Sequence, residues 1–132
     1  MDRVTALGGY LKVASSFTAN PGQFDCALLT AGWVDTLRGT TFMEDWVGAY
    51  QSLPEGRRLL RAKGIKSLRD LARKELTSVG GWMAALPGDV AVIKDRHLAL
   101  GIVGTGGKIH TVTEEVGLDV VPLDRAWEVF RP

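Results

Sequence analysis

The hydrophobic pattern of this chain changes at Gly80-Gly81, and the change limits the fold more than any other feature of the sequence. Before these glycines, apolar residues recur at the spacing of amphipathic helices; after them, they form short runs separated by turn residues. Helices followed by a meander of strands are typical of α+β domains rather than of alternating βαβ units. A chain of 132 residues has the length of one domain with one core. We therefore expect a single α+β domain over residues 1–132.

The N-terminal part is predicted to be helical. Asp25 is a favourable N-cap and Gly39 a favourable stop for the helix between them, which places Cys26 in its first turn. Pro54 suits the start of a later helix, and Ser67 caps the one after it. The predicted helices span Val4–Val13, Asp25–Leu37, Phe42–Tyr50, Pro54–Ala62 and Ser67–Leu76.

The C-terminal part is predicted to form antiparallel strands joined by tight turns. Thr105-Gly106-Gly107 is a strong hairpin signal, because paired glycines accept the positive φ that such turns demand. The predicted strands span Asp89–Ile93, His97–Val103, Lys108–Thr113 and Leu118–Pro122. A last short helix is predicted over Leu123–Val129, at the end of the chain.

Composition argues against several kinds of partner. Sixteen Lys and Arg against fifteen Asp and Glu leave a net charge of +1, so nucleic acid is not an expected partner. The densest basic stretch, Arg57–Arg73, is interrupted by apolar residues at helical spacing, as on the solvated face of a helix. No segment has the length of a signal core or a membrane span, so membrane insertion is not expected. A single cysteine makes no internal disulfide, which fits synthesis in the cytoplasm.

Cys26 is the candidate nucleophile. At a helix N-terminus, free backbone N–H groups and the helix dipole stabilise a thiolate. The alternative is that a lone cysteine fills space between helix and sheet as a small buried hydrophobe. One cysteine and two histidines without a carboxylate at ligand spacing do not predict a metal site, and no cofactor is expected.

His97 and His110 are the candidate bases, because a cysteine nucleophile needs one and the chain has no other histidine. With a hairpin turn centred on Thr105-Gly106, His110 would lie opposite Gly101. It would then share a face of the sheet with Ala99 and, farther along, with His97. The two histidines would lie roughly 7 Å apart along the strand, too far to touch one thiol together.

Four short motifs follow one another along the chain: Phe24-Asp-Cys-Ala-Leu-Leu29, Pro87-Gly-Asp-Val-Ala-Val-Ile93, Leu100-Gly-Ile-Val103 and Lys108-Ile-His110. Their order resembles that of the NlpC-type cell-wall cysteine peptidases, which have a papain-like fold. A closer resemblance is to a small phage-encoded family of unassigned function, related to those peptidases and found among tail genes. It extends over nearly the whole chain and includes Arg58-Leu-Leu60 and Ala126-Trp-Glu-Val129.

This resemblance implies a papain-like fold with a degenerate site. Cys26 falls on the nucleophile position and His110 on the position that orients the histidine, but the base, two residues before Gly101, is replaced by Ala99. His97 or His110 would have to act as base instead.

The resemblance also implies a role. We expect a structural component of a phage tail tip or baseplate, located in the virion and bound to the tail hub or neighbouring tail proteins in several copies. The first alternative is an active cysteine peptidase or amidase that cleaves peptidoglycan during genome delivery. The second is a cellular protein that binds an amide or acyl ligand in a remnant cleft.

Overall fold

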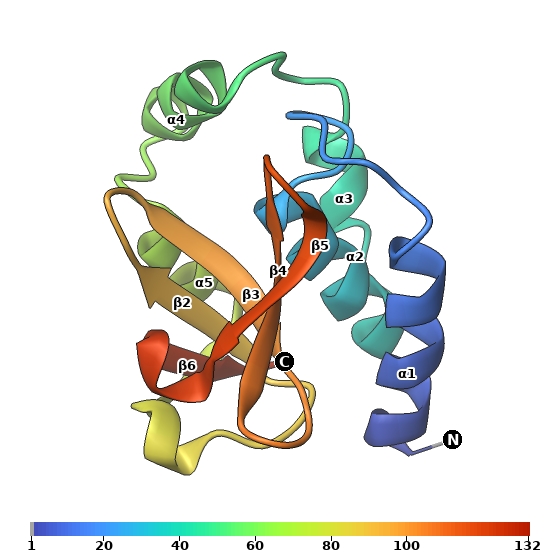
Figure 1. The fold of residues 1–132 in the computed structure, drawn as a ribbon. Coiled ribbons are helices and arrows are strands. Elements are labelled where there is room, and N and C mark those ends of the chain that lie inside the picture. Colours follow the sequence, from blue (N-terminus) through green and yellow to red (C-terminus); the bar gives the residue numbers. More distant parts are fainter. Residues whose placement is uncertain (1) are drawn as a thin grey trace.

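The computed structural model describes residues 2–132, and it confirms an α+β architecture with helices first and a sheet after them (Figure 1). The helices are α1 (Arg3–Ala14), α2 (Cys26–Arg38), α3 (Phe42–Trp46), α4 (Leu53–Ala62) and α5 (Leu68–Glu75). The strands are β1 (Thr77–Gly80), β2 (Val90–Lys94), β3 (Leu98–Val103), β4 (Lys108–Thr113), β5 (Gly117–Pro122) and β6 (Ala126–Arg131), with short 3-10 turns at Trp82–Ala84 and Leu123–Arg125.

The predicted caps of α2 and α5 are confirmed, whereas the helix predicted over Phe42–Tyr50 ends at Trp46. The Asp25 carboxylate accepts the Leu28 N–H at the start of α2, and Gly39 ends the helix in the left-handed conformation with φ 68°. Ser52 and Ser67 cap α4 and α5 in the same way, through the N–H groups of Glu55 and Asp70. Each cap satisfies a backbone donor that a helix leaves free at its N-terminus.

All six strands belong to one antiparallel sheet in the order β1-β6-β2-β3-β4-β5. Helix α2 packs on one face of this sheet, where Leu29 and Trp33 meet Ile102, and Val34 meets Leu100. A second core fills the other face. It takes apolar side chains from every strand: Val79, Ala91, Ile93, Ala99, Val103, Ile109, Val121, Ala126 and Val129.

The end of the chain was predicted wrongly as a helix over Leu123–Val129. Only Leu123–Arg125 forms a turn of 3-10 helix, and residues Ala126–Arg131 form β6, between β1 and β2. The strand β1 was not predicted at all. Both errors have one cause: β6 and β1 pair with each other, and β6 is fixed in the sheet by β2, more than thirty residues away in sequence. Such pairing leaves little local signal.

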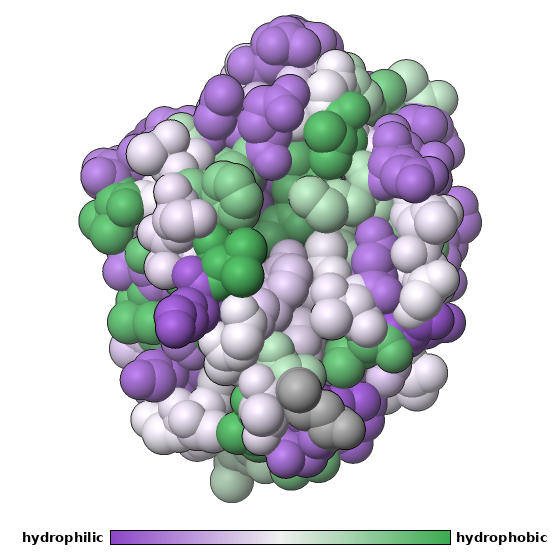
Figure 2. Space-filling view, turned by 90° about the vertical axis from the view of Figure 1, so that its right-hand side faces the viewer, coloured by the Kyte–Doolittle hydropathy of each residue, from purple (hydrophilic) through white to green (hydrophobic). Residues whose placement is uncertain are grey.

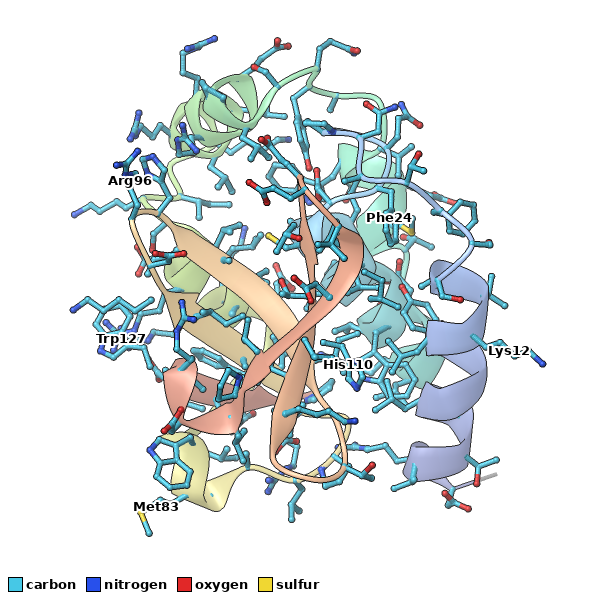
Figure 3. All side chains as sticks on the ribbon, viewed as in Figure 1. Lys12, Phe24, Met83, Arg96, His110 and Trp127 are labelled. Carbon is cyan, nitrogen blue, oxygen red and sulfur yellow. The ribbon has the colours of Figure 1, made fainter. Side chains whose placement is uncertain are left out.

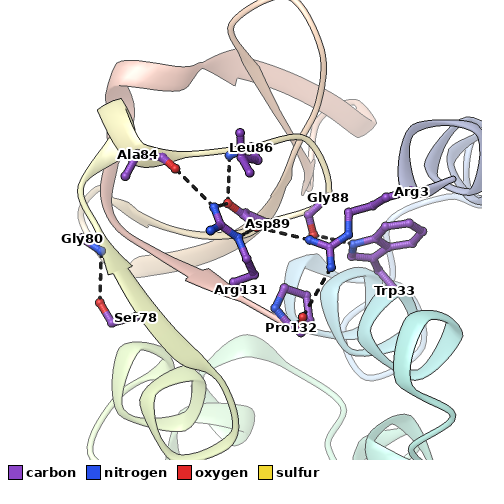
Figure 4. A network of polar contacts seen from close by, with 10 residues as sticks. All are labelled: Arg3, Trp33, Ser78, Gly80, Ala84, Leu86, Gly88, Asp89, Arg131 and Pro132. Atoms are coloured by element: carbon purple, nitrogen blue, oxygen red, sulfur yellow. Dashed lines mark hydrogen bonds and ion pairs between the residues drawn. The ribbon is translucent and has the colours of Figure 1, made fainter.

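The start of β2 is fixed by a buried carboxylate (Figure 4). Asp89 is fully buried, and Arg131 binds it with two hydrogen bonds of 3.0 and 2.7 Å. The Arg3 guanidinium lies 3.5 Å from the same carboxylate, and the Leu86 N–H donates to it at 2.8 Å. Next to it, the Trp33 indole N–H donates to the Gly88 carbonyl at 2.8 Å. The Pro-Gly-Asp motif thus ties α1, α2 and the C-terminal strand together.

Candidate functional site around Cys26

Cys26 begins α2, as predicted, but its surroundings do not favour a thiolate. Burial raises the pKa of the Cys26 thiol to about 11, and the negative charge of Asp25 adds to the effect. The backbone N–H groups of Leu100, Ala27 and Cys26 itself act in the opposite direction, but they are outweighed. At pH 7 such a thiol is ionised in only about one molecule in ten thousand.

The neighbour of Cys26 on the sheet is the backbone of Leu100. Pairing between β3 and β4 is limited to Ile102 with His110 and Val103 with Ile109. Beyond Ile102, the Leu100 N–H interacts with the Cys26 sulfur, and the Leu100 carbonyl accepts the Thr111 hydroxyl at 2.8 Å. Cys26 therefore lies against β3 at the place where the pairing of β3 with β4 ends.

Both oxygens of the Asp25 carboxylate accept hydrogen bonds from other parts of the fold. One carboxylate oxygen caps α2 through Leu28, while the other accepts the Gly22 N–H at 3.0 Å and the Tyr50 hydroxyl. Tyr50 is 6% exposed. Burial, the hydrogen bond to Asp25 and the nearby charges raise the pKa of Tyr50 well above its usual range. Sequence reasoning missed Tyr50, because nothing local connects it to a carboxylate twenty-five residues away.

His110 does not lie where it was predicted. The hairpin register is shifted by one residue, so that His110 is opposite Ile102 instead of Gly101. Because side chains alternate along a strand, this shift moves His110 to the face that packs on α2. Its ring lies over Gly104, close enough that a Cβ on that glycine would be 2.5 Å from the histidine Nε2. Figure 3 shows His110 beside β4, the strand next to the edge strand β5.

Ala99 lies on the face opposite to Cys26. It packs against the second core with Ile93 and Ile109, whereas α2 and its cysteine lie on the other side of the sheet. The prediction that Ala99 and His110 share a face was therefore wrong, for the same one-residue shift of register. Leu98, Leu100 and Ile102, which pack toward the helices, are the β3 side chains on the cysteine side.

His97 is exposed in the turn between β2 and β3. It lines a large groove of about 1060 Å³, which Cys26 also lines. Across residues 2–132, no hydrogen bond joins the Cys26 sulfur to either histidine ring. The structure therefore places Cys26 and His97 on one groove, without a hydrogen bond between them among the described residues.

A family model described as a domain of unknown function (DUF6950) matches residues 2–132. This chain belongs to the DUF6950 family. A comparison with curated proteins finds no significant match.

Metal sites and membrane-spanning helices were also sought in the described part of the DUF6950 domain. Over the described residues, no group of three or more His, Cys, Asp and Glu side chains is placed to hold a metal ion. None of the helices in residues 2–132 has the length and apolar character that a bilayer span requires. What the DUF6950 domain does offer is the groove, with a mostly apolar lining and with a margin of charged side chains.

Proposed function

We propose that this domain is a non-catalytic structural component of a phage tail tip or baseplate, built on an NlpC-like fold whose peptidase site is degenerate. The observation that carries the loss of catalysis is the environment of Cys26: a half-buried thiol, next to the backbone of Leu100, whose pKa is raised to about 11 by its desolvation. A cysteine nucleophile needs a lowered pKa or an adjacent base. Cys26 has neither.

The placement in a phage tail rests on the resemblance of the motif order described above. A binding role is supported by apolar side chains that remain in solvent, since such residues often mark contact surfaces. Val13 on α1 is 63% exposed and Phe17 after it 54% exposed. The face that carries α1 shows apolar residues among polar ones around a hollow (Figure 2).

An active cysteine peptidase or amidase is the second candidate. It is favoured by the position of Cys26 in the first turn of α2 and by His97 on the same groove. In that reaction Cys26 would form a thioester with the acyl group of peptidoglycan, and backbone N–H groups at the helix start would stabilise the oxyanion.

One experiment separates the two. The purified protein and its Cys26→Ala variant are incubated with peptidoglycan fragments, and virions from cells that encode the chain are analysed by mass spectrometry. We expect no cleavage by either protein, and the chain in the virions at a fixed ratio to the tail proteins. Cleavage that is lost in Cys26→Ala would establish the enzyme, and absence of the chain from virions would contradict the structural role.

A further inference from the structure

The groove of about 1060 Å³ lies between α4 with the loop after it and the body of the domain. Helix α4 stands apart from the sheet in Figure 1, and Leu60 is its only buried residue. The apolar lining of the groove includes Leu53 and Leu60 of α4 and Leu68 and Leu71 of α5. Small-molecule sites measure roughly 300–1,000 Å³. The groove is therefore large enough for a segment of polypeptide.

The α4 side of this groove is basic. Arg57 and Arg61, one turn apart on α4, and Lys63 and Lys66 after it line the groove. None of them forms an ion pair with a carboxylate of residues 2–132. Arg96 is at the tip of the β2–β3 hairpin, which lies beneath α4 in Figure 3, and it forms no ion pair with a carboxylate of residues 2–132. Its neighbour Asp95 also lines the groove and lies 3.8 Å from Arg125.

These cations differ from other arginines of the domain. Arg69, Arg73 and Arg131 each bind a carboxylate that is at most 11% exposed in its side chain. Arg57, Arg61, Lys63 and Lys66 instead pair with no carboxylate among residues 2–132, although they surround an apolar surface. Lys63 lies over the Trp46 ring, 5.4 Å from its centroid. Unpaired charge of one sign in a concave site attracts ligands of the opposite sign.

The opposite margin of the groove has the other sign. Glu114 and Glu115, in the turn between β4 and β5, also line it and form no ion pair within the described chain. A bound segment therefore has a preferred orientation, with its acidic side chains toward α4 and away from this turn.

We propose that this groove binds a peptide segment of a partner protein, with apolar side chains against the leucines and acidic side chains against Arg57 and Arg61. This inference deepens the proposed function and rests on it, since it names the kind of partner that a binding module would hold. The apolar lining favours a peptide over nucleic acid, whose phosphate backbone gains nothing from four leucines.

The test uses a library of random twelve-residue peptides displayed on phage and selected on the full chain. The test variant is Arg57→Glu/Arg61→Glu. The control is Lys12→Glu/Arg58→Glu, which changes the net charge equally at exposed positions outside the groove. No side-chain hydrogen bond or ion pair is lost in either variant, so both are expected to fold.

We expect selected peptides to combine Asp or Glu with large apolar residues. Their dissociation constants should rise at least about tenfold in Arg57→Glu/Arg61→Glu and less than about twofold in the control. Glu114→Lys/Glu115→Lys should tighten binding. The proposal is overturned if no peptide is enriched, if the peptides lack acidic residues, if both charge variants bind equally, or if DNA competes through the same arginines. Those outcomes leave the virion and peptidoglycan results untouched, so the two proposals fail separately.

Discussion

Tyr50 donates a hydrogen bond to the carboxylate of Asp25, directly beside the cysteine that begins α2. The same carboxylate oxygen accepts the Gly22 N–H, so the loop before α2 and the segment before α4 are joined at this point. Tyr50 and Asp25 are both buried. Asp25 therefore fixes the helix start, and it is not free to orient a histidine.

We expect Tyr50→Phe to destabilise the domain. Hydrogen bonds to charged groups contribute roughly 1.5–3 kcal/mol, and the phenylalanine would leave the Asp25 carboxylate short of one buried donor. Tyr10→Phe is the matched control, because the Tyr10 hydroxyl donates to the neutral Leu29 carbonyl at 2.6 Å and should cost only about 0.5–1.5 kcal/mol. Urea unfolding measures both. An equal or larger loss in the control would contradict the role of the Asp25–Tyr50 pair.

The ion pair of Asp89 and Arg131 should contribute far more than those at the surface. Replacing Arg131 by Met leaves a fully buried carboxylate with the Leu86 N–H and Arg3 at 3.5 Å, and we expect a loss of about 3–5 kcal/mol. Arg125→Met is the control. Arg125 lies 3.8 Å from the exposed Asp95, and its removal should cost less than about 1 kcal/mol. Similar losses in the two variants would show that the Asp89 network does not hold the strand ends.

Acid should weaken the fold through His110. Burial, and then the charge of Lys108, lower the pKa of His110 below its ordinary value of 6.5. The unfolded chain then binds a proton more readily than the folded one. The contribution of His110 to the free energy of unfolding is fully present above the pKa that this histidine has in the unfolded chain. It falls as the pH drops below that value, until the pKa of His110 in the folded protein is reached.

We therefore expect the wild-type protein to lose more stability between about pH 7.5 and 5 than His110→Gln does. The exposed His97 provides the control variant, His97→Gln, which should keep most of the wild-type dependence on pH. Urea midpoints at the two pH values measure the effect. Equal dependence on pH in the wild-type protein and in His110→Gln would refute the placement of His110 in a half-buried site.

Local chemistry was enough to predict the helices and most of the strands. Asp25, Ser67 and Gly39 are cap residues whose preference depends on a few neighbouring atoms, and each acts as predicted. The four predicted strands also correspond closely to β2, β3, β4 and β5, because each is a short apolar run between turn residues.

Features that depend on distant contacts were not predictable in the same way. Ala126–Arg131 becomes a strand because β1 and β2 lie on either side of it. The hairpin signal at Gly106-Gly107 gave the turn but not its register, and one residue of register decides which face His110 takes. The position of Cys26 at a helix start followed from Asp25, whereas Tyr50 and the Leu100 backbone reach it only through the tertiary fold.

The most direct test of a non-catalytic Cys26 is the pH dependence of its alkylation. Cys26 is the only cysteine, so the rate of its reaction with iodoacetamide in the folded protein reports the thiolate of this residue alone. We predict negligible reaction at pH 7 and a rate that rises to a half-titration near pH 11. A half-titration below about pH 7, with rapid alkylation of the native protein, would contradict this account and indicate an activated nucleophile.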